Sequence, residues 1–296
     1  ERSRGLGDVY KRQTYQYGIK AYQILEQVEE KRLDEEQLYS LALAYNLMGY
    51  AVLHVYGKKD SMEYAEKALL KASEILQMIQ ADNKKKKRLF TANQGDLAAL
   101  NIVKKDYQKA FQIHCDNVAF RKEMLEEEPE QDYKKMVAAS YKGMATALFY
   151  LSREHMEQRE LLLQKSYQYH CRSVEYYEKA YAPDYHFDRM VEENRCIGTL
   201  CQLLEYLPED ELRTALPDAL ERMNRAVSYS IHMDIRNEGE LQNSLNNVKK
   251  LLEKMWQENM VDEVFLKKYA ALLNYVDVKW NRSEINNRKE VFTNEK

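Results

Sequence analysis

The sequence predicts an all-α protein, on three observations. Its 296 residues are 45% hydrophobic but include only nine glycines and four prolines, so few turns interrupt the chain. Residues that favour helices dominate the stretches between the prolines, and the period-2 alternation of strands is hard to find. The third observation is that Lys109-Ala-Phe-Gln-Ile-His-Cys returns 56 residues later as Lys165-Ser-Tyr-Gln-Tyr-His-Cys. Such repetition predicts an α-solenoid of stacked antiparallel helix pairs.

The two ends of the chain do not fit this pattern. Residues 1–13 lack an initial Met and helical periodicity, and they resemble a spurious peptide from translated sequencing reads. We expect them to be non-native, with a short basic arm as the alternative. Residues 280–296 are mostly polar and are expected to form a tail. Residues 14–279 are therefore the expected helical repeat domain.

The first predicted helix is Thr14–Glu30, which resembles the second helix of a pair. One of its faces is apolar and carries Ile19, Tyr22, Leu25 and Val28. Since a partner helix would precede it, we expect the chain to start within a repeat.

The first helices of the following pairs are marked by a small residue between larger apolar ones. The matching sets are Tyr45, Met48, Gly49 and Val52; then Tyr141, Met144, Ala145 and Leu148; then Asn194, Ile197, Gly198 and Cys201; a weaker set is centred on Gly95. The markers are 46, 50 and 53 residues apart, which predicts long helices or full loops.

The second helices carry small residues on either side of a large one, which lets two helix backbones approach closely. These triplets are Ala65, Leu69, Ala72; Ala110, His114, Asn117; Ser166, His170, Ser173; and Ala219, Met223, Ala226. We expect all of them at helix-packing positions.

Together these residues resemble the tetratricopeptide-repeat superfamily over residues 14–278. The stretch from Asn117 to Tyr150, with Arg121, Leu125 and an acidic loop from Glu126 to Asp132, is similar to the long variant in kinesin light chains and bacterial regulators. The resemblance implies a right-handed solenoid of about five repeats that binds protein or peptide. Because the first repeat is truncated, we expect the sensor or adaptor part of a longer bacterial signalling protein, with an effector before residue 14.

Composition argues against several other classes. The 45 basic and 48 acidic residues are mixed along the chain, so nucleic acid is not an expected partner. No apolar run approaches the ~20 residues of a membrane span. The four cysteines form neither a disulfide framework nor a metal knuckle, which favours a reduced, cytoplasmic protein. The oligomeric state is not predicted.

The residues that could bind a metal or act in catalysis each have a simpler structural interpretation. His114-Cys115 and His170-Cys171 could bind zinc, but adjacent helical residues point about 100° apart, so core packing is favoured. Cys196 and Cys201 are five residues apart, a poor spacing for shared coordination. Without a catalytic motif near the histidines, neither an enzyme nor a cofactor is expected. The acidic pair Glu192-Glu193 and the basic run Lys84–Arg88 are interpreted as solvated.

The concave groove lined by first helices is the predicted binding site, since helical solenoids commonly hold a peptide there. Counting along each first helix from its small marker residue predicts which side chains line this groove. They are Asn46, Tyr50, His54, Asp96, Lys142, Thr146, Tyr150, Arg195, Thr199 and Gln202. Lys142 and Arg195 occupy equivalent positions and could bind a carboxylate. A solvated groove in a domain that binds through another face, and a groove that senses a small molecule, are the alternatives.

Overall fold

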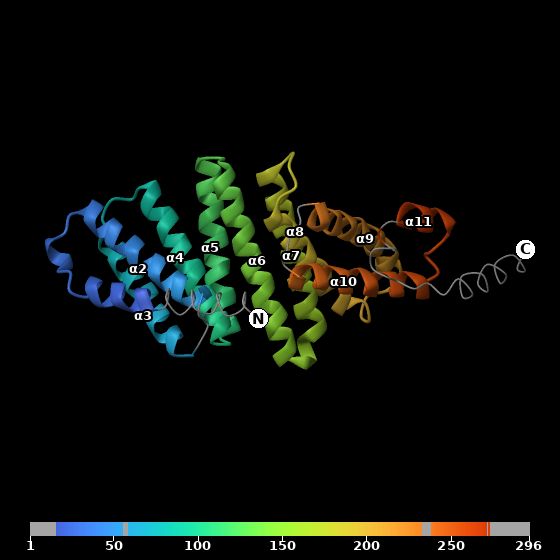
Figure 1. Ribbon diagram of the computed structural model, residues 1–296, viewed down its shortest axis with the longest axis horizontal. Helices are drawn as coiled ribbons and strands as arrows, with labels where there is room; N and C mark the ends of the chain where they lie inside the picture. Colours follow the sequence, from blue (N-terminus) through green and yellow to red (C-terminus); the bar gives the residue numbers. More distant parts are fainter. Residues whose placement is uncertain (1–15, 56–58, 233–237, 271, 273–296) are drawn as a thin grey trace, which may run out of the picture. The chain divides into compact units, whose positions relative to one another are not determined.

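A computed structural model of the protein describes residues 16–55, 59–232, 238–270 and 272. Over those ranges the chain is helical with connecting turns and contains no strand, which confirms the all-α prediction (Figure 1). The expected non-native segment 1–13 and polar tail 280–296 lie outside the described residues. Within the predicted repeat domain the chain forms two compact units, which divide between Ala182 and Pro183.

The first unit contains six long helices after a helical stretch at residues 16–25 and a short 3-10 turn, η1 (Glu30–Arg32). They are α2 (Glu35–Val55), α3 (Lys59–Met78), α4 (Lys84–Val103), α5 (Tyr107–Glu127), α6 (Gln131–Glu154) and α7 (Arg159–Tyr181), with η2 (Met156–Gln158) before α7. Each packs against the next, and Figure 1 shows them following in chain order from blue to olive. Helices α2, α4 and α6 also contact one another in succession, as first helices of stacked pairs do.

Paired helices are antiparallel, as contacts between their opposite ends show. Glu35 begins α2, and its carboxylate accepts hydrogen bonds from the backbone N–H groups of Gln80 and Ala81, just after α3 ends. The side chain of Gln131, which begins α6, donates to the carbonyl of Ala180 near the end of α7 at 2.6 Å. Short loops with side-chain caps make these reversals: Asn83 accepts from the backbone N–H of Lys86, and Asp106 from that of Lys109.

Small residues lie where the helices approach most closely. All twelve members of the four second-helix triplets are buried, which confirms their predicted packing positions. At Gly49 on α2, a Cβ atom would lie 2.7 Å from the Leu69 side chain of α3. Only glycine allows that approach, because real Cβ atoms do not come so near another heavy atom.

The second unit contains α8 (Phe187–Leu203), α9 (Glu209–His232), α10 (Glu238–Gln257) and the short α11 (Glu263–Lys268). Helix α9 packs against both α8 and α10, and α8 also contacts α10. The side chains of Lys268 and Tyr269 both bond the Glu221 carboxylate, which ties the α11 end to α9.

One expectation about this unit is wrong. Glu192 and Glu193 were expected to be solvated, but both are fully buried on α8. The Glu193 carboxylate accepts hydrogen bonds from the Tyr185 hydroxyl and from Arg189 Nε, the latter at 3.1 Å. A buried carboxylate is tolerated here because charged and polar donors replace its water shell.

Candidate functional site

The predicted groove residues on α2 and α4 form part of a buried polar network. Asn46 is only 5% exposed; its Nδ2 donates to Asp96 Oδ2 at 3.1 Å, and its Oδ1 accepts from Asn93 Nδ2 at 2.9 Å. Burial raises the pKa of Asp96 to about 6, against the lowering effects of the Asn46 hydrogen bond and the nearby Arg121 charge. Tyr50 is 49% exposed, whereas the side chain of His54 lies outside the described residues.

Arg121 of α5 lies behind these residues and joins α4 to α6. Its guanidinium donates to the Thr91 carbonyl at 2.6 Å, and to the Met136 carbonyl and Ser140 hydroxyl at 2.7 Å each. Burial lowers the pKa of Arg121 to about 10, and the Asp96 charge opposes that shift. The sequence analysis assigned Arg121 to the long-repeat stretch but did not predict that it links α4 to α6. An isolated Arg on an apolar helix face was the signal that could have indicated this role.

On α6 the predicted groove residues differ in what surrounds them. Thr146 donates its hydroxyl to the Lys142 carbonyl at 2.8 Å, so it is bonded within its own helix. Tyr150 stacks on Tyr107 of α5, with ring centroids 5.2 Å apart. Lys142 is half-buried and lies near enough to His114 to lower the pKa of that imidazole. These residues therefore offer one partly exposed cation and, about two turns further along α6, an aromatic pair.

His114 occupies a packing position rather than a metal centre. It is 8% exposed, and a Cβ at Gly143 would lie 2.1 Å from its Nε2, so the imidazole packs directly on the α6 backbone. Burial, with Arg121 and Lys142 nearby, lowers its pKa to about 3 and keeps the ring neutral. No group of three His, Cys, Asp or Glu side chains in the described part of the chain has metal-binding geometry.

In the second unit the three predicted groove residues all lie on or near the last two turns of α8. Arg195 is exposed, Thr199 is 1% exposed and donates to the Arg195 carbonyl at 3.1 Å, and Gln202 is half-buried. Neighbouring Cys201 donates to the Asn247 carbonyl at 3.6 Å, and burial raises its pKa to about 12. Arg195 therefore presents the accessible charge of this set.

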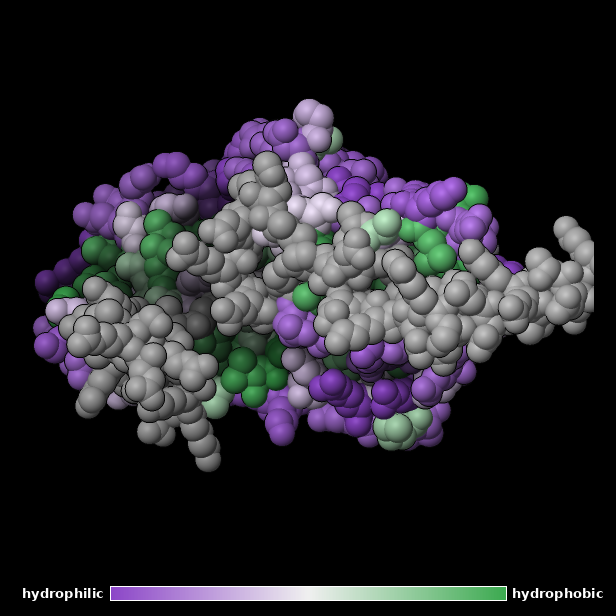
Figure 2. Space-filling view, turned by 45° about the vertical axis from the view of Figure 1, so that its right-hand side comes forward, coloured by the Kyte–Doolittle hydropathy of each residue, from purple (hydrophilic) through white to green (hydrophobic). Residues whose placement is uncertain are grey.

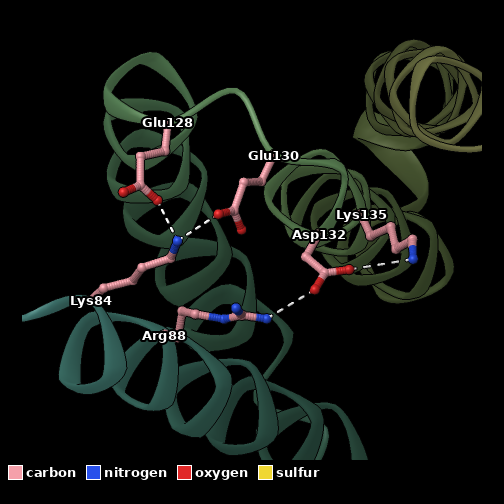
Figure 3. Close-up of polar contacts among 6 residues, drawn as sticks. All are labelled: Lys84, Arg88, Glu128, Glu130, Asp132 and Lys135. Carbon is pink, nitrogen blue, oxygen red and sulfur yellow. Dashed lines mark hydrogen bonds and ion pairs between the residues drawn. The ribbon is translucent and has the colours of Figure 1, made fainter.

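The basic run from Lys84 to Arg88 forms the first turn of α4 and is paired with acidic residues. Figure 3 shows Lys84 between Glu128 and Glu130, and Arg88 beside Asp132, which also pairs with Lys135. The Arg88–Asp132 distance is 3.1 Å. Because Lys84 is neutralised by Glu128 and Glu130 of the loop between α5 and α6, and Arg88 by Asp132 in the first turn of α6, these two cations do not form an open phosphate site.

The surface gives two further observations. In the face shown by Figure 2, hydrophilic residues cover most of the described area, with hydrophobic residues grouped in a few places between them. An apolar pocket of about 240 Å³ lies between α4 and α5, with Phe90 and Phe120 among its walls.

Among the described helices, none has the length and apolar character needed to cross a bilayer.

Stacked antiparallel helix pairs, with polar contacts between successive first helices, define a helical-repeat protein. Comparison with solved structures agrees: the chain is similar to BtubC (BKLC) from P. vanneervenii, with a TM-score of 0.52 over 90% of this chain and 92% of that chain. At 13% sequence identity this likeness shows the fold alone. No family model and no curated protein matches the sequence.

Proposed function

We propose that the protein is a non-enzymatic helical-repeat scaffold that binds protein or peptide. In this proposal the fold is a right-handed solenoid of about five tetratricopeptide-like repeats, acting in the cytoplasm as part of a bacterial signalling protein. The observation that supports it is the succession of contacting first helices α2, α4 and α6, since such helices form the ligand-binding face of helical solenoids.

Within the first unit the ligand is proposed to contact Tyr50 and Lys142. Tyr50 offers a half-exposed ring with a polar tip, and Lys142 offers a positive charge on the next but one first helix. Asn46 and Asp96 are proposed to hold the surface in place beneath the ligand. In the second unit Arg195, with Thr199 and Gln202 on the same helix, is proposed as a charged contact position of that unit in its own right.

Selection from a library of short random peptides, followed by fluorescence anisotropy on the purified chain, tests this function. Lys142→Glu should weaken the selected peptides at least about tenfold, because it reverses the charge that contacts them. Arg195→Glu is measured separately, and Lys165→Glu on the exposed surface of α7 is the matched control. Binding unaffected by both Lys142→Glu and Arg195→Glu would place the site elsewhere. A thermal shift with metabolites and no peptide ligand would favour the small-molecule sensor.

A further inference from the structure

A second cluster of charged and aromatic residues lies where α5, α6 and α7 meet, away from the groove residues. We call it the cation–tyrosine cluster and define it as Lys122, Tyr141, Arg172, Tyr176 and Lys179. Tyr141 and the groove residue Lys142 are adjacent on α6, so their side chains point about 100° apart. The cluster is therefore a different surface from the one proposed above.

The floor of the cluster is a set of tyrosine rings. Tyr141 is 3% exposed, and its ring lies 5.7 Å from that of Tyr176 and 6.0 Å from that of Tyr169, centroid to centroid. Tyr169 and Tyr176 are themselves only half-buried. They leave aromatic surface accessible next to the charged groups.

Three cations surround this floor. Lys122 Nζ and the Arg172 guanidinium lie 5.5 and 5.9 Å from the centre of the same Tyr141 ring, and Lys179 Nζ lies 5.3 Å from that of Tyr176. The ring faces attract the cations, but that attraction leaves most of their hydrogen-bond donors unused. Arg172 alone carries five donors in a planar fork.

No carboxylate among the described residues neutralises these charges. Within the described ranges none of the three cations forms an ion pair with Asp or Glu, although exposed Glu175 lies on the same helix. A hydrogen bond with Tyr141 raises the pKa of Lys122, and the nearby Arg172 charge opposes that rise, so the two cations repel each other. This contrasts with Lys84 and Arg88, whose carboxylate partners are in place.

We propose that the cation–tyrosine cluster binds the phosphate group of a phosphorylated tyrosine on a partner protein or peptide. A phosphate monoester carries a charge of about −1.5 to −2 at neutral pH, which matches two or three uncompensated cations. Arg binds such a group through two parallel hydrogen bonds, and Lys adds a point charge. The half-buried rings of Tyr169 and Tyr176 are placed to stack on the aromatic ring that carries the phosphate.

Isothermal titration with a short phosphotyrosyl peptide tests this proposal. The peptide should bind, and its unphosphorylated and phosphoseryl counterparts should bind at least about tenfold more weakly, because they lack the phosphate or the ring. Affinity should fall as salt is raised. Equal binding of the unphosphorylated peptide, or of inorganic phosphate, would overturn the proposal.

Variants then locate the site. Lys122→Gln combined with Arg172→Gln should reduce the affinity for the phosphotyrosyl peptide at least about tenfold, because it removes charge-assisted hydrogen bonds. Arg153→Gln is the matched control, since Arg153 also lies 5.0 Å from a single aromatic ring, that of Phe149. Lys179→Gln, at an exposed position, gives a second measurement if the double variant is unstable. If the double variant folds, undiminished peptide binding would refute the assignment. If the double variant does not fold, undiminished peptide binding by Lys179→Gln would refute it.

Discussion

Asn46 and Asn93, 47 residues apart, are joined side chain to side chain between the first helices α2 and α4. The same relationship occurs in the second unit, where Asn247 Nδ2 of α10 donates to Asn194 Oδ1 of α8, also at 2.9 Å. In both places the amide lies at a helix contact and also bonds a backbone carbonyl, Leu69 for Asn93 and Asn194 for Asn247. Because a hydrogen bond requires a fixed alignment, these pairs set the register of successive first helices.

Replacing Asn93 tests the contribution of this contact to stability. Asn93→Leu leaves Asn46 Oδ1 without its Asn93 donor in a site that is 0% exposed, and it removes a second hydrogen bond from the Leu69 carbonyl, which lies within α3. A buried unsatisfied acceptor costs about 1–3 kcal/mol and a lost hydrogen bond about 1 kcal/mol, so we expect the free energy of unfolding to fall by about 3 kcal/mol in urea titrations. Gln77→Leu, on the exposed surface of α3, is the control. A similar small change in both variants would show that the amide pair adds little.

Two glycines on first helices should respond oppositely to alanine. At Gly143 the new Cβ would lie 2.1 Å from His114 Nε2, whereas at Gly95 the nearest side-chain atom, on Arg121, is 3.6 Å away. Gly143→Ala should therefore destabilise by about 1–3 kcal/mol, although alanine favours helices by about 1 kcal/mol. Gly95→Ala, in ordinary contact, should leave thermal stability equal or higher.

A second variant separates the steric clash at Gly143 from other effects. In a His114→Ala background the imidazole is absent, so Gly143→Ala should no longer be destabilising there. A penalty that persists in that background would mean that the α6 backbone cannot accept a side chain for a reason other than His114.

Helix content and packing positions could be predicted from the sequence because they depend on local periodicity and residue size. The triplet around Leu69 is an example, since small residues at fixed spacing on an apolar face have few other uses. Glu193 could not be placed, because its burial depends on Arg189, Tyr185 and the neighbouring α9. Groove positions assigned by counting from a marker residue are also sensitive to small errors, because an error of one residue turns a side chain by about 100° around the helix. Among the groove residues predicted on α8, for example, Thr199 is buried whereas Arg195 is exposed.

Asp96 should make stability depend on pH. Its pKa is raised from 3.8 to about 6 by burial, so between these values the folded state binds more protons than the unfolded state. The free energy of unfolding should therefore fall as pH rises through this range, by on the order of 2 kcal/mol. Asp96→Asn keeps an acceptor for Asn46 but removes the titration.

The comparison of Asp96→Asn with the natural chain isolates this effect. His114 titrates in the opposite sense: its pKa is lowered from 6.5 to about 3, so its contribution is lost as pH falls through that range. Since both proteins contain His114, its effect cancels in the difference between their unfolding free energies. We expect Asp96→Asn to gain stability relative to the natural chain between about pH 4 and pH 7. A constant difference would contradict the raised pKa.

Glu193 should be among the most sensitive positions of the second unit. Its carboxylate is bonded by Tyr185 and Arg189, and Arg225 lies 3.9 Å away. Glu193→Leu removes the carboxylate that Arg189 Nε contacts at 3.1 Å, and the Arg189 side chain is only 13% exposed. Breaking a buried ion pair costs about 3–5 kcal/mol, which hydrogen exchange should report as lost amide protection in α8 and α9. Exposed Glu205→Leu is the control, and equal protection in the two variants would show that the carboxylate does not stabilise these helices.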